Sequence, residues 1–407
     1  MVCRVGKRRL VTLSQGAWWA APQHRLDGVI PGFALDVRNQ RYALGGAPRA
    51  IGDLISVSNA APGTYIDNAG VLRQAAADTP RIDWTNGVPE LLLEGAITNK
   101  VTCRKHNPTN TSNISITGDA AAILSVVDDT AALISAGLYD ICTNGYVYKL
   151  DNSAGLTAAV AYPSGTSGNT NSHVYQCYMR GGTCQLGPSD AARLTVPASP
   201  IYIRRAYVGT PGVASSQLAV CADAGQIVYF VLPHFAEASV AGSIIPGSTL
   251  AAVTRTTDVC TLSSLAAAVL QGAGAAVAWR GGAVATSAYQ TLFGVVSGRG
   301  LYLSGGDPAI IGIDSPAAPL AIAATAIAPT PIGAAFGWGA SGRRGASTGQ
   351  TVVSSSTLFG ASTSTFAIGN VSSGLSSGQI LRVRQVVGWS LPDRPSPGGV
   401  QAQARAA

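Results

Sequence analysis

The chain has 407 residues, enough for roughly two to four domains that each bury a core. Charged residues make up only 12% of it, against about 25% in typical globular domains. This composition fits an extended protein, with a surface of hydroxyl and amide groups or with much surface buried between subunits, better than a compact enzyme.

The net charge of +7 permits nucleic-acid binding, but the distribution of basic residues argues against it. Apart from Arg4, Lys7, Arg8 and Arg9 these residues are scattered, and 23 of the 27 are arginine. Scattered guanidinium groups suit bidentate contacts at protein interfaces better than a stripe that follows phosphates. We expect no nucleic-acid partner.

Hydrophobic segments give no sign of export or membrane insertion. The apolar run after Lys7–Arg9 is broken at Ser14–Gly16, so we expect no cleaved export signal. The longest apolar stretches, 265–279 and 317–327, fall short of the ~20 residues of a membrane span.

Residues 1–48 form an arm with candidate strands at 33–37 and 41–44 but without enough apolar residues for a core of its own. The pair Trp18 and Trp19 admits two interpretations. It anchors the arm in a neighbouring protein, or it caps the arm against the first domain.

Residues 49–100 predict a small module of two hairpins. Asp67–Gly70 separates two short β-prone runs, and Asn86–Gly87 supplies the positive φ angles that a tight hairpin turn requires. The polar residues of this module either form a ligand site or hydrogen-bond the turns and pair charges at its edge; they are Arg81, Asp83, Glu94, Thr98 and Asn99.

Residues 101–262 predict an antiparallel β-sandwich from short β-prone runs divided by turn residues. The expected strands are 146–150, 156–162, 173–177, 192–196, 201–208, 218–221 and 226–232, and the main expected helix is 123–136.

The seven cysteines show no metal-ligand spacing, and we expect no metal and no cofactor. Cys177 and Cys184 flank Arg180–Thr183, which could turn a hairpin and bring the two sulfurs together as a disulfide. The alternative is two buried thiols.

Residues 263–395 predict a second β-sandwich, and residues 396–407, rich in Pro, Gly, Gln and Ala, predict a flexible tail. The expected strands are 275–279, 291–296, 301–303, 334–338, 349–353, 365–368 and 380–389. The fold class is therefore mainly β, with an arm and a hairpin module ahead of two antiparallel sandwiches.

The run from Gly63 to Leu72, continued by Pro80-Arg-Ile-Asp-Trp84 and Glu90–Asn99, resembles a module of bacteriophage tail-fibre and other virion surface proteins. A second mark, Ile245-Pro-Gly-Ser-Thr249 with Val253-Thr-Arg-Thr-Thr-Asp258, is similar to the closing segment of phage jelly rolls that resemble carbohydrate-binding modules. The family's preceding Gln-x-Glu-x-Gly reads His234-Phe-Ala-Glu237 here, which puts an inherited ligand contact in doubt. The order of the last strands resembles a concanavalin A-like or laminin-G-like sandwich.

Catalytic motifs are almost absent from the sequence. Glutamate occurs only at 90, 94 and 237, and the candidate pair Asp128 and Asp129 is adjacent, so it cannot flank one sugar from two sides. The four histidines lie far apart in the sequence. We expect no enzyme activity.

The resemblance implies a protein made in the host cytoplasm and carried on the virion surface, held to other virion proteins through the arm. Two hypotheses remain: a short spike or tail fibre that binds a bacterial surface glycan, or a structural collar, head or baseplate component. We expect a homotrimer, because spikes at symmetric positions are closed oligomers. The residues predicted to contact a glycan are Tyr302, Asp307, Trp338 and Arg343.

Overall fold

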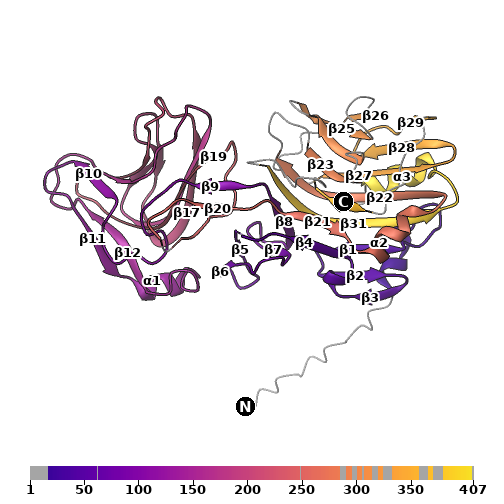
Figure 1. Ribbon diagram of the computed structural model, residues 1–407, viewed down its shortest axis with the longest axis horizontal. Helices are drawn as coiled ribbons and strands as arrows, with labels where there is room; N and C mark the ends of the chain where they lie inside the picture. Colours follow the sequence, from indigo (N-terminus) through magenta and orange to yellow (C-terminus); the bar gives the residue numbers. More distant parts are fainter. Residues whose placement is uncertain are drawn as a thin grey trace, which may run out of the picture.

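The structure is a computed structural model, and its fold is mainly β with two lobes joined through a narrow junction (Figure 1). It describes residues 17–61, 63–247, 249–284, 290–295, 300–304, 307–313, 320–323, 332–356, 365–369 and 379–405.

The right-hand lobe in Figure 1 is a sandwich of two antiparallel sheets, which we call the terminal sandwich because both ends of the chain contribute to it. In the described part of the chain its larger sheet has ten strands: β1 (Phe33–Asp36), β2 (Arg41–Leu44), β3 (Ala47–Arg49), β7 (Arg81–Asp83), β8 (Glu90–Glu94), β22 (Gly274–Val284), β27 (Ile332–Gly339), β28 (Gly342–Ser347), β29 (Val353–Ser355) and β31 (Ile380–Leu391).

The facing sheet has seven strands among the described residues, and its outer strand β4 comes from the N-terminal part of the chain. These strands are β4 (Ile55–Ser58), β21 (Val259–Leu262), β23 (Gln290–Val295), β24 (Gly300–Ser304), β25 (Asp307–Ile313), β26 (Leu320–Ala323) and β30 (Phe366–Ile368). Alternate residues of both sheets, Trp279 and Phe293 among them, fill the core between them.

The left-hand lobe is a second sandwich, which we call the inserted sandwich because the chain enters it after β8 and returns before β21. One sheet is β10 (Ile114–Gly118), β13 (Ala159–Pro163), β18 (Leu218–Ala222), β15 (Cys184–Pro188) and β16 (Leu194–Val196). The other is β11 (Ile123–Asp128), β12 (Tyr146–Asp151), β19 (Ile227–Glu237), β14 (His173–Gly181) and β17 (Ser199–Gly209).

The predicted strands of the inserted sandwich are confirmed, but the predicted helix over 123–136 is wrong in its first half. Residues 123–128 pair with β12 as strand β11, and only Thr130–Ser135 form helix α1. Cross-strand pairing decided the conformation of this segment, which contains Val126 and Val127, residues that favour strands.

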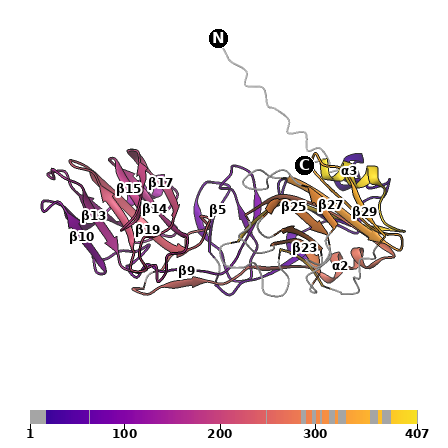
Figure 2. The same cartoon turned by 90° about the horizontal axis from the view of Figure 1, so that it is seen from above.

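The two predicted hairpins of the module are present and lie between the lobes in both views (Figures 1 and 2). Strand β5 (Thr64–Ile66) pairs with β6 (Leu72–Gln74), and β7 pairs with β8 around Gly87, whose φ is 73°. The connections into and out of the inserted sandwich also pair, as β9 (Ile97–Asn99) with β20 (Val253–Arg255).

The prediction of a separate arm over 1–48 is corrected for its described part. Strand β1 pairs with β31 and places Phe33 opposite Gly388, where any side chain would collide with the Phe33 ring. The short helices η1 (Trp18–Ala20) and η2 (Pro22–His24) cover the outer face of the same sheet. This part of the arm has a core, but later parts of the chain, up to its C-terminal helix, supply most of it.

The prediction of a flexible tail over 396–407 is also corrected. Pro397–Arg405 form helix α3, which buries Val400 and Ala404 in a cluster with Trp19 and Trp389. The remaining helices are short: η3 (Ile51–Asp53), α2 (Ser264–Ala268) and η4 (Val269–Gln271). The prediction failed because the local sequence, rich in Pro and Gly, does not show that the folded chain offers an apolar surface for this helix to cover.

Replacing Phe33 with alanine should destabilise the terminal sandwich by about 3–5 kcal/mol, because it empties a fully buried aromatic site. All six tryptophans lie outside 101–258, so tryptophan fluorescence during urea unfolding reports on this sandwich and the junction. Leu156→Ala, at a position 89% exposed, is the control and should change stability by less than about 0.5 kcal/mol. An independent arm would leave the Phe33→Ala transition at the wild-type urea concentration.

Candidate functional site

The densest cluster of charged side chains lies at the junction between the two sandwiches. Arg81 comes from β7, Glu94 ends β8, and Arg255 ends β20, with Asp258 three residues later. All four are buried, with relative exposures between 0% and 3%. Segments 160 residues apart in the sequence therefore meet in this cluster.

Glu94 is the centre of the cluster. Its Oε2 receives Arg81 Nη1 at 2.6 Å and lies 3.1 Å from Arg255 Nη1. The backbone N–H of Ser243 donates to Oε1 and its hydroxyl donates to Oε2, each at 2.7 Å. Burial alone would raise the pKa of the Glu94 carboxyl, but Arg255, Arg81 and Ser243 outweigh it and hold the pKa well below its ordinary value.

Asp258 binds the same guanidinium from the other side. Its carboxylate pairs with Arg81 Nη2, accepts the backbone N–H of Glu94 at 2.7 Å, and accepts the side-chain amide of Asn59. Asn59 directly follows β4, so this group ties the smaller sheet of the terminal sandwich to the junction.

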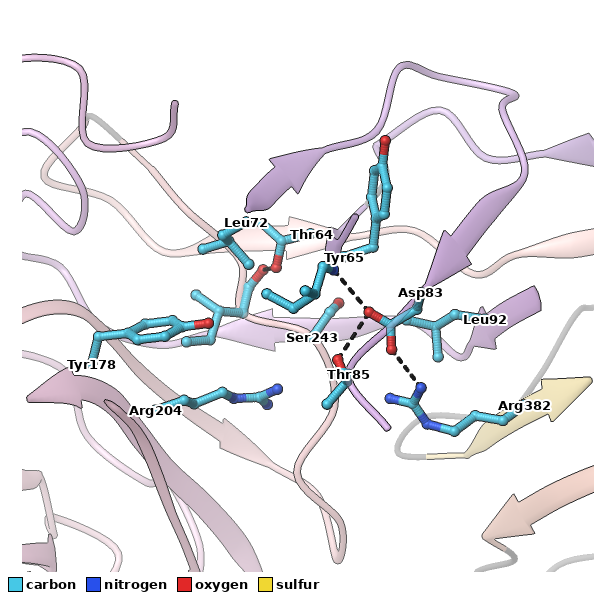
Figure 3. Close-up of a pocket in the computed structure, with 12 residues that line it drawn as sticks. Thr64, Tyr65, Leu72, Asp83, Thr85, Leu92, Tyr178, Arg204, Ser243 and Arg382 are labelled. Atoms are coloured by element: carbon cyan, nitrogen blue, oxygen red, sulfur yellow. Dashed lines mark hydrogen bonds and ion pairs between the residues drawn. The ribbon is translucent and has the colours of Figure 1, made fainter. Parts of the chain in front are cut away.

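A second layer of ion pairs joins the junction to β31. Asp83 pairs with Arg382, and Glu90 Oε1 accepts Arg384 Nε at 2.7 Å. Figure 3 shows Asp83 reaching Arg382 on one side and Thr85 and the backbone of the β5 hairpin on the other.

The inserted sandwich contributes a polar group of its own. Arg204 on β17 donates to Gln176 Oε1 at 2.5 Å and to the backbone carbonyl of Gly242. The side-chain amide of Gln176 in turn contacts His234 Nδ1. Burial, with the charges of Arg255 and Arg204, lowers the pKa of His234 to about 3, so this imidazole is neutral at physiological pH.

These ion pairs hold the two sandwiches together, and we call the cluster the junction clamp. It leaves little space for a substrate. Every carboxylate of the cluster is held by at least one guanidinium. The cavity in Figure 3, between Tyr178, Arg204, Ser243 and Arg382, measures about 20 Å³, space for about one water and too small for a sugar. Among the described residues no group of three or more His, Cys, Asp or Glu side chains is placed to hold a metal.

The structure resolves the two interpretations of the module's polar residues in favour of internal bonding. Arg81, Asp83 and Glu94 pair charges, Asn99 donates to the carbonyls of Pro233 and Ile245, and Thr98 contacts Thr254. Most of these groups lie in the protein interior rather than at the edge of the module.

The predicted glycan face on the terminal sandwich is not exposed. Trp338 is 6% exposed and packs with Phe336 and Phe366, while Tyr302 and Arg343 are 3% and 4% exposed. The side chain of Asp307 lies outside the described residues. The prediction is corrected because Trp338 joins the core between the sheets, its cross-strand partner Arg343 lies on the same face, and Tyr302 is buried as well, so a sugar cannot reach these side chains.

The predicted disulfide is also corrected: Cys177 and Cys184 are both free buried thiols. Cys177 is on β14 and Cys184 on β15, in opposite sheets of the inserted sandwich. The segment between them crosses from one sheet to the other and forms no hairpin, and both thiols join the core between the sheets.

The tryptophan pair packs against other parts of the same chain. Trp19 is 6% exposed in a cluster with Trp389, and Arg41 lies over the Trp18 ring at 4.3 Å. The pair covers the terminal sandwich, however, and not the first domain after the arm.

Arg204, Arg382 and Arg384 were missed as members of the junction. Arg382 and Arg384 alternate with Leu381 and Val383, so the period of two already places both on one face of a strand. Their partners on β7 and β8 lie almost 300 residues earlier, which no local pattern reveals.

Comparison with protein-family models and with curated proteins finds no match for this chain.

Replacing Glu94 with glutamine should destabilise the protein by about 3–5 kcal/mol, because Arg81 and Arg255 stay buried without their shared counter-charge. The pKa of Glu94 is lowered by folding, so its contribution is complete above about pH 4.5 and is lost as the pH falls below that value. Urea unfolding at pH 7 and at pH 4 should therefore separate wild type from Glu94→Gln more strongly at pH 7.

The matched control is Glu237→Gln, the same chemical change at a side chain that is 43% exposed. It should cost less than about 1 kcal/mol at either pH. Equal effects of the two substitutions would contradict the assignment of Glu94 as the centre of the clamp.

Proposed function

We propose that the chain is a structural protein of a bacteriophage particle, a short spike or tail fibre that attaches the particle to a glycan on the host surface. The proposal starts from the resemblance of residues 63–99 and 245–258 to phage virion surface proteins.

One observation carries the proposal: the two resembling segments meet in one buried ion cluster. Arg81 and Glu94 belong to the first segment, and Arg255 and Asp258 belong to the second. The residues that make the likeness in the sequence are thus the residues that bind the two sandwiches together.

The shape of the molecule supports a role as a rigid projecting element. The two sandwiches lie end to end with the hairpin module between them in both views (Figures 1 and 2). The paired connections β9 and β20 and the ion cluster both resist hinge motion between the lobes.

The three glutamates support a binding role rather than catalysis. Glu90 and Glu94 are held by arginines, and both oxygens of Glu237 accept side-chain amides, from Asn169 at 2.8 Å and Asn171 at 2.7 Å. Each carboxylate thus has a bonding role within the protein.

The alternative is a structural component that binds only other virion proteins. The burial of Tyr302, Trp338 and Arg343 favours it, because the predicted sugar contacts are inaccessible. The described part of the arm, residues 17–48, belongs to the terminal sandwich, so an anchor to the particle has to use another surface or residues outside the described ones. No helix in the described residues could cross a membrane.

Purified protein should compete with phage particles that carry it for adsorption to the host bacterium, and mass spectrometry of purified particles should detect the chain. Glu94→Gln, if its fold is lost, serves as the inactive control. Presence in particles without competition would select the structural alternative, and absence from particles would reject both.

We also propose a homotrimer, and β17 supports an intersubunit contact. This strand lies at the open edge of its sheet and exposes Ile201, Ile203 and Val208. Light scattering of purified protein should give about three times 41.2 kDa, and Ile201→Lys with Val208→Lys should lower that mass. A wild-type mass of one chain would contradict the trimer.

A further inference from the structure

A pocket of about 390 Å³ opens on the outer face of the larger sheet of the terminal sandwich, away from the junction clamp. This volume is within the ~300–1,000 Å³ typical of small-molecule sites. Its charged lining consists of one carboxylate and five basic side chains: Asp36, His24, Arg38, Arg41, Arg280 and Arg384.

The floor of the pocket is one row of residues across neighbouring strands. Asp36 on β1 lies opposite Gln385 on β31, Gln385 lies opposite Arg280 on β22, and Arg280 lies opposite Gly333 on β27. Residues opposite one another in antiparallel strands point to the same face. Gly333 carries no side chain, which leaves room beside the Arg280 guanidinium.

A β-bulge adds a second arginine to this row. Arg280 pairs with Gln385 and Gly281 pairs with Val383, so Arg384 is an extra residue on β31. A bulge redirects the side chain at its position, and bulges are frequent beside functional sites. The backbone N–H of Arg38 donates to the carbonyl of Arg384 at 3.1 Å and brings a third arginine to the rim.

The charges around the pocket do not balance. Asp36 pairs with Arg41 at 2.7 Å, and Arg384 pairs with Glu90, which lies outside the lining. Neither Arg38 nor Arg280 has an ion pair with any residue that the structure describes. Asp36, which is already paired with Arg41, is also the carboxylate whose charge acts on Arg280, so the lining as a whole keeps a positive charge.

Arg280 is the more deeply buried of these two arginines, with a relative exposure of only 8%. Its Nη2 donates to the carbonyl of Gln403 at 2.9 Å, but its buried Nε has no hydrogen-bond partner among the described residues. Burying a guanidinium that has no ion pair of its own is costly, and such a group gains most from an anion that enters the site. Burial is the main cause that lowers the pKa of His24, and the charges of Arg280 and Arg41 lower it further against the opposing charge of Asp36.

We propose that this pocket binds one anionic group of a glycan, a sugar carboxylate or phosphate, with Arg280 and Arg38 as its principal donors. That the anionic group belongs to a glycan rests on the proposed function, whereas the binding of an anion is inferred from the pocket alone. A planar guanidinium pairs with either group through two parallel hydrogen bonds.

Isothermal titration calorimetry of the full chain at low ionic strength tests the proposal with three probes: glucuronate, glucose 6-phosphate and glucose. At least one anionic probe should bind and glucose should not, and the anion that binds identifies the preferred group. No heat from either anionic probe, or equal binding of glucose, would overturn the proposal.

Three variants locate the binding. Arg38→Gln, at an exposed position, and Arg280→Lys, which keeps the charge but loses the forked geometry, should each weaken binding roughly tenfold or more. The matched control Arg49→Gln, exposed on β3 outside the lining, should bind like wild type. Equal weakening by Arg38→Gln and Arg49→Gln would assign the effect to general charge and reject the pocket.

Adsorption, particle composition and probe binding, measured together on the wild-type protein, separate this inference from the proposed function. Wild-type protein that competes for adsorption but binds neither anionic probe would keep the proposed function and reject the pocket. A pocket that binds glucuronate or phosphate in a protein absent from particles would keep the site and reject the virion role.

Discussion

A single buried carboxylate, Glu94, holds together the segments that meet at the junction between the two sandwiches. Two arginines and a serine from three different segments converge on it, and each of them would be costly to bury alone. The resulting charge balance holds only when the hairpin module, the returning chain and the end of β8 are all in place. The buried charges of the cluster are therefore compensated only when the two sandwiches take this one arrangement.

The position of the cluster explains why the inserted sandwich sits as a fixed extension rather than as a loosely tethered domain. The outgoing and returning connections pair as β9 and β20. Where they reach the terminal sandwich, the backbone N–H of Glu94 donates a hydrogen bond to the Asp258 carboxylate. The terminal sandwich in turn encloses its core only when strands from before and after the insertion pair, as β1 does with β31. Rigid coupling of this kind suits a protein that presents one lobe while the other is held.

Two groups of arginines differ in how their charge is compensated. At the junction, Arg81 and Arg255 satisfy buried carboxylates and leave a cavity too small for a ligand. On the outer face of the larger sheet, Arg280 and Arg38 have no ion pair among the described residues and border an open pocket.

The sequence by itself determined the fold class, most strands and both hairpins of the module, because alternation of apolar residues and turns such as Asn86–Gly87 are local signals. Arg81, Glu94, Arg255 and Asp258 lie in the two segments that carry the resemblance, whereas Arg382 and Arg384 lie outside them. Only the tertiary structure decided that these residues meet, that Cys177 and Cys184 lie in opposite sheets, and that Trp338 points inward. The N-terminal strands and helix α3 looked unsupported because their partners are hundreds of residues away. Pairing, burial and charge compensation over such separations depend on the path of the whole chain, and no local pattern encodes that path.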